Sequence, residues 1–127
     1  MQNTISPDAR RAALPDAPHE GGVTLINSFV VPEDRDEEFL AMWTETSHYF
    51  RRRPGFVSLR LHRALSPGAA HRYVNVAKWE RQQDFAAAHG TATFRELVSR
   101  PEWGAFPSSP VLFEAVVEEG PLEADPA

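Results

Sequence analysis

The sequence predicts an α+β domain with the element order β-α-β-β-α-β, in which helices cover one side of a four-stranded antiparallel sheet, the ferredoxin-like pattern. Three observations support this fold class. Four segments are rich in β-branched and aromatic residues, two regions show helical spacing of apolar residues, and Pro and Gly punctuate the boundaries. The chain has 127 residues, 42% of them hydrophobic, which suffices for one domain with a core.

The first half of the domain reads as strand, helix and strand. Residues 23–31 are β-branched and mostly apolar, which is typical of a strand. Pro32 opens a helix that we expect to reach Arg53, because acidic residues occupy its first turns and arginines its last, complementing the helix dipole. The inward stripe of this helix consists of Leu40, Trp43, Ser47 and Phe50. Pro54 and Gly55 end it, and a second strand follows at 56–65.

The second half is expected to contain a strand at 71–80 that forms a hairpin with the second strand, helices at 81–89 and 91–99, a loop at 101–110 and a last strand at 111–119. Residues 1–21 and 120–127 lack periodicity and are rich in Pro, Ala, Asp and Gly, so we expect tails around a domain at 22–119. The first and last strands look apolar on both faces. Because helices cover only one face, we expect a homodimer in which two sheets face each other.

Charge and composition exclude several classes of function. The net charge of −5 argues against nucleic acid and anionic membrane as partners, and the run Arg51-Arg52-Arg53 is too short to change that. Without cysteine there is no disulfide, thiolate metal site or thiol catalysis. No secretory signal and no apolar run of membrane-spanning length is present, so a cytoplasmic protein is expected. No group of His, Asp and Glu has metal-ligand spacing, so we expect no metal site.

The strand at 71–80 carries the strongest chemical signal. Side chains alternate along a strand, so Tyr73, Asn75, Ala77 and Trp79 share a face. A phenol, an amide and an indole N–H among aromatic surface suit a flat organic ligand. Asn27 lies on the apolar face of the first strand, where an unpaired amide is costly to bury. It therefore either satisfies a neighbouring group or faces a cavity.

The chain resembles the antibiotic biosynthesis monooxygenase family of dimeric α+β barrels over nearly all of 22–119. The resemblance rests on the element order, on Pro54-Gly55-Phe56 at the second strand, and on Asn75-x-x-x-Trp79-Glu80 followed by Phe85. Within that family the chain is most similar to the cofactor-independent monooxygenases that oxidise anthrones to quinones in aromatic polyketide biosynthesis. The resemblance implies a small aromatic polyketide-like substrate, O₂ as co-substrate and no cofactor.

The resemblance also implies site residues. The matching positions are Asn75 and Trp79 on the third strand, Asn27 on the first, His62 on the second and Arg95 in the second helical region. Asn75 and Trp79 would donate hydrogen bonds, and Asn27 would orient the substrate carbonyl. His62 would carry protons, and the charge of Arg95 would favour the substrate anion. Tyr73, Phe85 and Trp103 are expected to contact substrate. Phe85 stands where some relatives have a tyrosine, so a proton donor is missing there.

Several of these residues have a structural alternative. His62 could be a surface histidine between Arg60 and Arg63, and Arg95 could be solvated. Trp103 and Phe106 could form either a lid or a satellite hydrophobic cluster.

Other positions argue against different chemistry. His89 follows a helix and reads as a partner of its C-terminal dipole, while His48 and His71 have no matching partners. Haem degraders of this fold need a Trp and a His at positions that are Ala88 and Val98 here. The rival function is a non-oxygenase that binds a small hydrophobic ligand, has a cyclase-like role or assists a partner oxygenase.

Overall fold

The computed structural model describes His19 and residues 21–125, and the predicted tail at 1–21 lies outside this range except for His19 and Gly21. The strands are β1 (Val23–Phe29), β2 (Phe56–Arg63), β3 (Tyr73–Trp79) and β4 (Ser108–Phe113). The helices are α2 (Asp36–Phe50), α3 (Gln82–His89), α4 (Ala92–Val98) and a 3₁₀ helix, η1 (Pro101–Ala105). All pairings are antiparallel, and the strand order is β2-β3-β1-β4.

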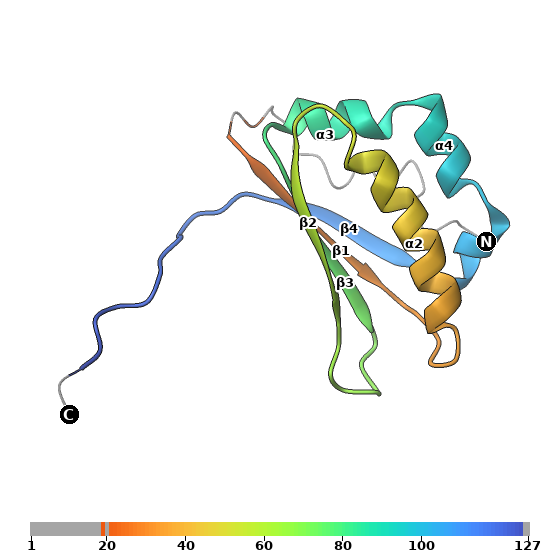
Figure 1. The fold of residues 1–127 in the computed structure, drawn as a ribbon, viewed down its shortest axis with the longest axis horizontal. Helices are drawn as coiled ribbons and strands as arrows, with labels where there is room; N and C mark the ends of the chain where they lie inside the picture. The colour runs from red at the N-terminus through yellow and green to blue at the C-terminus, as the bar shows by residue number, and fades with distance from the viewer. Residues whose placement is uncertain (1–18, 20, 126–127) are drawn as a thin grey trace.

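The helices lie on one side of this sheet, which confirms the predicted fold class (Figure 1). In the central strands β1 and β3, buried side chains alternate with half-buried ones and, at Lys78, an exposed one, because one face packs against the helices. None of the helices in the described part of the chain is long and apolar enough to cross a membrane.

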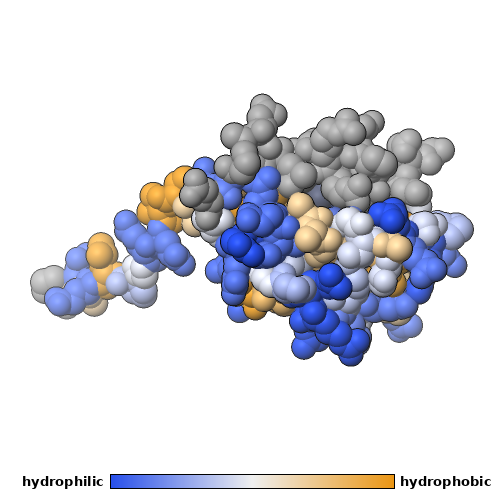
Figure 2. All heavy atoms as spheres, turned by 90° about the horizontal axis from the view of Figure 1, so that it is seen from above, coloured by the Kyte–Doolittle hydropathy of each residue, from blue (hydrophilic) through white to orange (hydrophobic). Residues whose placement is uncertain are grey.

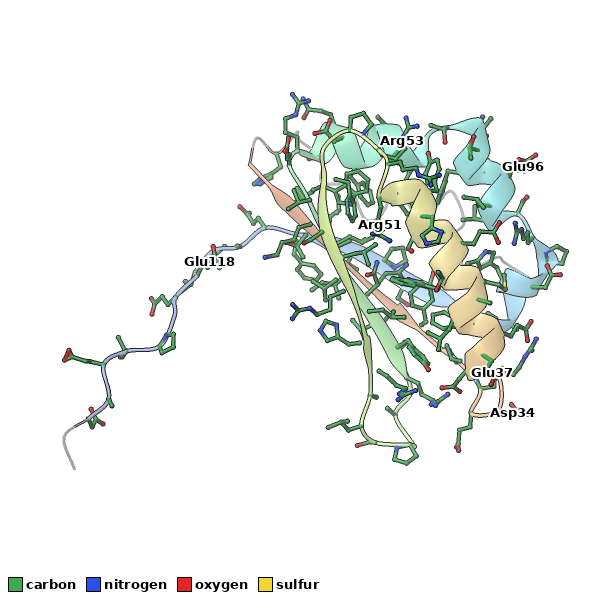
Figure 3. The ribbon with its side chains drawn as sticks, viewed as in Figure 1. Asp34, Glu37, Arg51, Arg53, Glu96 and Glu118 are labelled. Atoms are coloured by element: carbon green, nitrogen blue, oxygen red, sulfur yellow. The ribbon has the colours of Figure 1, made fainter. Side chains whose placement is uncertain are left out.

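α2 is shorter than predicted at both ends. The backbone N–H of Arg35 donates to the Pro32 carbonyl at 3.1 Å, so residues 33–35 form a turn before the helix begins. In the predicted inward stripe Ser47 is buried, and Leu40, Trp43 and Phe50 are half-buried and pack against the core. Phe39, which was not predicted, is fully buried near the start of the helix. Figure 3 shows Asp34 and Glu37 at one end of α2 and Arg51 and Arg53 at the other, as the helix dipole favours.

The turn after α2 depends on a glycine. Gly55 has φ +82°, a conformation that side chains with a Cβ rarely adopt. A Cβ at Gly55 would also collide with the carboxylate of Asp84, so the close approach of α3 requires this residue.

The C-terminal part differs most from the sequence-based expectation. The predicted loop at 101–110 contains η1, and the last strand covers 108–113 rather than 111–119. β4 pairs with β1 from Phe29↔Ser108 to Thr24↔Phe113, so it ends one residue short of the first residue of β1, Val23. Pro110 is tolerated because β4 is an edge strand. Beyond Phe113 the described chain extends away from the domain (Figures 1 and 2).

The other face of the sheet carries an apolar surface that the helices leave open. The register places five side chains together on it, which we call the open face: Ile26, Val74, Val76, Val111 and Phe113. Val111 and Phe113 are 44% and 47% exposed.

A polar cluster joins the start of α2 to the start of β3. The Arg72 guanidinium donates to both carboxylate oxygens of Asp36, at 2.9 and 3.0 Å, and to the carbonyl of Val31 at 3.1 Å. The Tyr73 hydroxyl donates to Asp36 Oδ2 at 2.5 Å. The hydrogen bonds from Arg72 and then Tyr73 lower the pKa of Asp36, while burial and the bond to Asp36 raise the pKa of Tyr73.

This cluster makes stability depend on pH in a defined direction. Because the pKa of Asp36 is lower in the folded protein than its ordinary 3.8, its bonds stabilise the fold above pH 3.8, and this is lost as pH falls through the folded value. Asp36→Asn is therefore expected to lower the free energy of unfolding at neutral pH and to flatten its decline below pH 3.8. Urea unfolding over a pH series measures both effects. Asp34→Asn, an exposed neighbour, is the control, and an unchanged acid decline in Asp36→Asn contradicts the assignment.

Candidate functional site

A partly open cavity of about 60 Å³ lies between the sheet and the helices. One water needs roughly 10–15 Å³, so the cavity has room for a small ligand group or several waters. The floor comes from β1 and β3, the roof from α2, and the far wall from α3, α4 and η1. Most of the lining is aromatic or aliphatic, and it includes Phe29, Trp43, Phe50, Phe56, Phe94 and Trp103.

The floor carries two asparagines directly opposite each other. Asn27 of β1 and Asn75 of β3 are register partners, and both line the cavity. Directly opposite residues on one face have Cβ atoms about 4.5–5.5 Å apart. Trp79 follows four residues after Asn75, on the same face of the strand, and also lines the cavity. The three residues are 5%, 9% and 2% exposed, respectively.

These three side chains have polar atoms with no partner. Asn27 Oδ1, Asn75 Oδ1 and Trp79 Nε1 are buried without a hydrogen bond. In the described part of the chain one further buried side-chain atom, Arg53 Nε, shares this condition. Leaving a buried polar group unpaired costs roughly 1–3 kcal/mol. Three such atoms around one cavity are the arrangement expected of a site that is completed by a ligand.

The chemical complement of the site follows from these atoms. Two amide oxygens accept hydrogen bonds and one indole N–H donates, so the cavity matches a flat ligand with hydroxyl donors and a carbonyl or oxyanion acceptor. That Asn75 donates stays a prediction: a side-chain amide has both donor and acceptor atoms, and its acceptor Oδ1 is the one that is buried without a partner.

His89 also lines the cavity, and the sequence reasoning did not assign it to the site. It ends α3 and its Nδ1 lies 2.8 Å from the Phe85 carbonyl oxygen, so the expected bond at the helix C-terminus is present. The ring is only 6% exposed and packs against Phe85, Phe94 and Phe50, with centroids 4.0, 4.7 and 4.8 Å away. The spacing Phe85-x-x-x-His89, which puts both rings on one helix face, is the sequence signal that could have found it.

Two of the predicted site residues lie away from the cavity. His62 is exposed on β2 and pairs with Val74, whose side chain belongs to the open face. The helices and the cavity are on the opposite side of the sheet. Arg95 is exposed on α4, and its guanidinium donates to the Gly90 carbonyl at 3.0 Å. The surface alternative weighed for His62 and Arg95 is therefore the one that the structure shows.

Three further predicted residues are buried. Tyr73 is absent from the cavity lining, and its hydroxyl is bound to Asp36. Phe85 lies behind the lining, with its ring 6.1 Å from that of Trp79. Trp103 does line the cavity, but as a wall rather than a lid, because its Nε1 donates to the Leu97 carbonyl at 3.1 Å and its ring packs with Phe106 in the core.

The two positions at which a haem degrader is expected to carry a Trp and a His are Ala88 and Val98. Ala88 is buried in the core, and Val98 lines the cavity. In the described residues no three His, Cys, Asp or Glu side chains lie close enough together to hold a metal ion.

The sequence matches a known protein family over the part of the chain that forms most of this site. The family model described as antibiotic biosynthesis monooxygenase matches residues 22–100. The chain belongs to this family. The matched range holds the whole floor of the cavity together with α2, α3 and α4. No curated protein matches the sequence closely enough to count as a relative.

Solved structures of similar proteins share the fold. A candidate monooxygenase from Shewanella loihica PV-4 is 28% identical, with 79% of this chain and 99% of that one covered and a TM-score of 0.68. SnoaB, a cofactor-independent oxygenase from Streptomyces nogalater, is 26% identical, with coverages of 77% and 96% and a TM-score of 0.64. A point mutant of MhuD, solved with two manganese protoporphyrin IX bound per active site, is 29% identical, with coverages of 78% and 99% and a TM-score of 0.62.

If the floor asparagines serve a ligand rather than the fold, removing one should stabilise the empty protein. Asn75→Leu is expected to raise the free energy of unfolding by roughly 1–3 kcal/mol, because a similar apolar shape replaces an unsatisfied amide. Thermal unfolding measures the change. Thr91→Val is the opposite control: the Thr91 hydroxyl accepts from the Phe94 backbone N–H at 3.0 Å, so its removal should cost about 1 kcal/mol. A lower melting temperature for Asn75→Leu contradicts this interpretation.

Proposed function

We propose that this protein is a cofactor-independent monooxygenase that oxidises a flat phenolic compound of the anthrone class to a quinone with O₂. The observation that carries the proposal is the set of three unpartnered atoms, two acceptors and one donor, in an aromatic cavity. Membership of the monooxygenase family and the likeness to SnoaB, a cofactor-independent oxygenase, support the same reaction class.

The substrate chemistry explains why such a site suffices. An anthrone methylene loses a proton to give a delocalised carbanion, which passes an electron to O₂. Recombination forms a carbon–oxygen bond, and loss of water from the resulting hydroperoxide leaves the quinone carbonyl, so that one oxygen atom enters the product and the other leaves as water. The protein must bind the flat ring, stabilise the developing oxyanion and keep water out.

Each floor residue has a role in this scheme. The Trp79 indole N–H donates to the substrate carbonyl, which becomes the oxyanion when the methylene ionises. Asn27 Oδ1 and Asn75 Oδ1 accept from phenolic hydroxyls and hold the ring in register with Trp79. Because the two asparagines are paired across β1 and β3, the sheet itself fixes their separation.

Trp79→Phe should lower the rate of anthrone oxidation about a hundredfold or more, which is the typical cost of losing one donor to a developing oxyanion. Asn75→Ala, which removes an acceptor for a substrate hydroxyl, should lower it about tenfold. Trp79→Phe keeps most of the aromatic volume, so its melting temperature should change little from packing alone. Oxygen uptake with a hydroxyanthrone measures the rate, and Tyr73→Phe, which alters only the Asp36 cluster, is the control. Parental rates in both variants would show that this strand face is structural.

The same experiment separates the rival function. A non-oxygenase that binds a phenolic ligand would bind the hydroxyanthrone, seen as quenching of tryptophan fluorescence, without oxygen uptake above the uncatalysed rate. Binding with no catalysed oxygen uptake would therefore replace the oxygenase proposal with the ligand-binding one.

We also propose that the protein is a homodimer joined through the open face. Ile26, Val74 and Val76 lie at its centre, and Val111 and Phe113 extend it over the edge strand. An exposed apolar patch on a sheet is normally covered by a partner, and a second copy offers the same apolar surface.

Light scattering at micromolar concentration should give twice the 14.2 kDa of one chain. Val111→Glu places a charge in the patch at a 44% exposed position, so it should shift the protein to monomer while leaving the fold intact. Leu65→Glu makes the same exchange in the fully exposed turn after β2 and should stay dimeric. A monomeric parent protein would overturn the proposed dimer.

A further inference from the structure

The proposed reaction begins with removal of a proton from carbon, and the site needs a group that takes it. In the part of the chain that the structure describes, the cavity lining contains one imidazole, the side chain of His89. Imidazole is the side chain that enzymes use most often as a general base. The polar groups of the floor are amides and an indole, which do not act as bases near neutral pH. His62, the residue expected to move protons, lies on the opposite side of the sheet.

The hydrogen bond of His89 determines which nitrogen is basic. Its Nδ1 lies 2.8 Å from the carbonyl oxygen of Phe85, and a carbonyl can only accept. Nδ1 therefore carries the hydrogen, and in the neutral ring Nε2 holds the lone pair. The same hydrogen bond can persist after Nε2 has gained a proton, because Nδ1 is a donor in the imidazolium as well.

The surroundings hold the ring in place beside the proposed oxyanion donor. Rings from four elements face it: Phe50 of α2, Trp79 of β3, Phe85 of α3 and Phe94 of α4. The centroids of His89 and Trp79 are 6.5 Å apart. A flat ring whose carbonyl accepts from Trp79 carries its acidic methylene on the opposite carbon of the same ring, so both groups can serve one bound substrate.

We propose that His89 is the catalytic base of this site, an inference that rests on the proposed function. Nε2 takes a methylene proton, and the electron pair stays on the substrate as the delocalised carbanion that reacts with O₂. The imidazolium returns this proton to the peroxide oxygen, giving a hydroperoxide. Nε2 then removes the second methylene proton as the carbonyl forms and the O–O bond breaks. The departing hydroxide takes that proton, so the products are quinone and water, with His89 neutral again.

The test uses His89→Ala in the full chain, with a hydroxyanthrone as substrate. Loss of the base should lower oxygen uptake by about a hundredfold or more, while quenching of tryptophan fluorescence shows that the substrate still binds. Free imidazole should enter the space left by the side chain and restore the rate in a saturable way. Deuterium at the methylene should slow the variant by a primary isotope effect at least as large as that of the parent. His48→Ala, which removes an exposed histidine of α2, should behave as the parent.

His89→Phe keeps an aromatic ring among the others, so it tests the proposal if His89→Ala fails to fold. It should melt near the parental temperature, bind substrate and lose the rate. Parental oxygen uptake in either folded variant, or a loss in His89→Ala that imidazole does not restore, overturns the role of His89 and leaves the oxygenase proposal standing. Absence of oxygen uptake by the parent protein overturns the oxygenase proposal itself, and the role of His89 with it.

Discussion

The antiparallel pairing of β1 with β3 is the constraint on which the rest of this structure depends. Its register places Asn27 opposite Asn75, and a shift by one residue would move both amides to the open face. The same register places Val23, Leu25 and Ala77 beside Trp79 in one core cluster, and Phe29 beside Tyr73 in the other. The two asparagines thus lie between two apolar clusters. Backbone hydrogen bonds between the strands hold them there, and no site side chain takes part in these bonds.

The helices are held over this floor by polar contacts that lie outside the cavity lining. The Tyr49 hydroxyl of α2 donates to the carbonyl of Ala88, the residue before His89, at 2.6 Å, and it also contacts the Thr91 hydroxyl. Arg100, after α4, forms two hydrogen bonds to Glu45 of α2. These contacts fix the position of His89 relative to α2, while the cavity keeps its polar atoms for a ligand. Different residues therefore stabilise the fold and form the site. The unpaired polar atoms that lower stability are concentrated at the cavity floor.

Much of the fold was predictable because it depends on local patterns. The alternation in the first and third strands, the stripe on α2 and the Pro54–Gly55 stop are set by neighbours in sequence, and all appear in the structure. The ends of elements were less predictable, since they depend on distant partners. β4 stops at Phe113, next to the start of β1, although Ala115 and Val117 continue the apolar alternation, because β1 offers at most one more residue to pair with it.

By itself the sequence determined the element order, the shared face of Asn75 and Trp79, and the likeness to a monooxygenase family, because each depends on spacing along the chain. Only the tertiary structure decided which polar groups meet at one cavity. Alternation puts His62 on the opposite face once the register is set, and packing turns Arg95 outward and His89 inward. Burial and long-range contact decide whether a polar side chain is solvated, satisfied or available to a ligand, and neither is a property of local sequence.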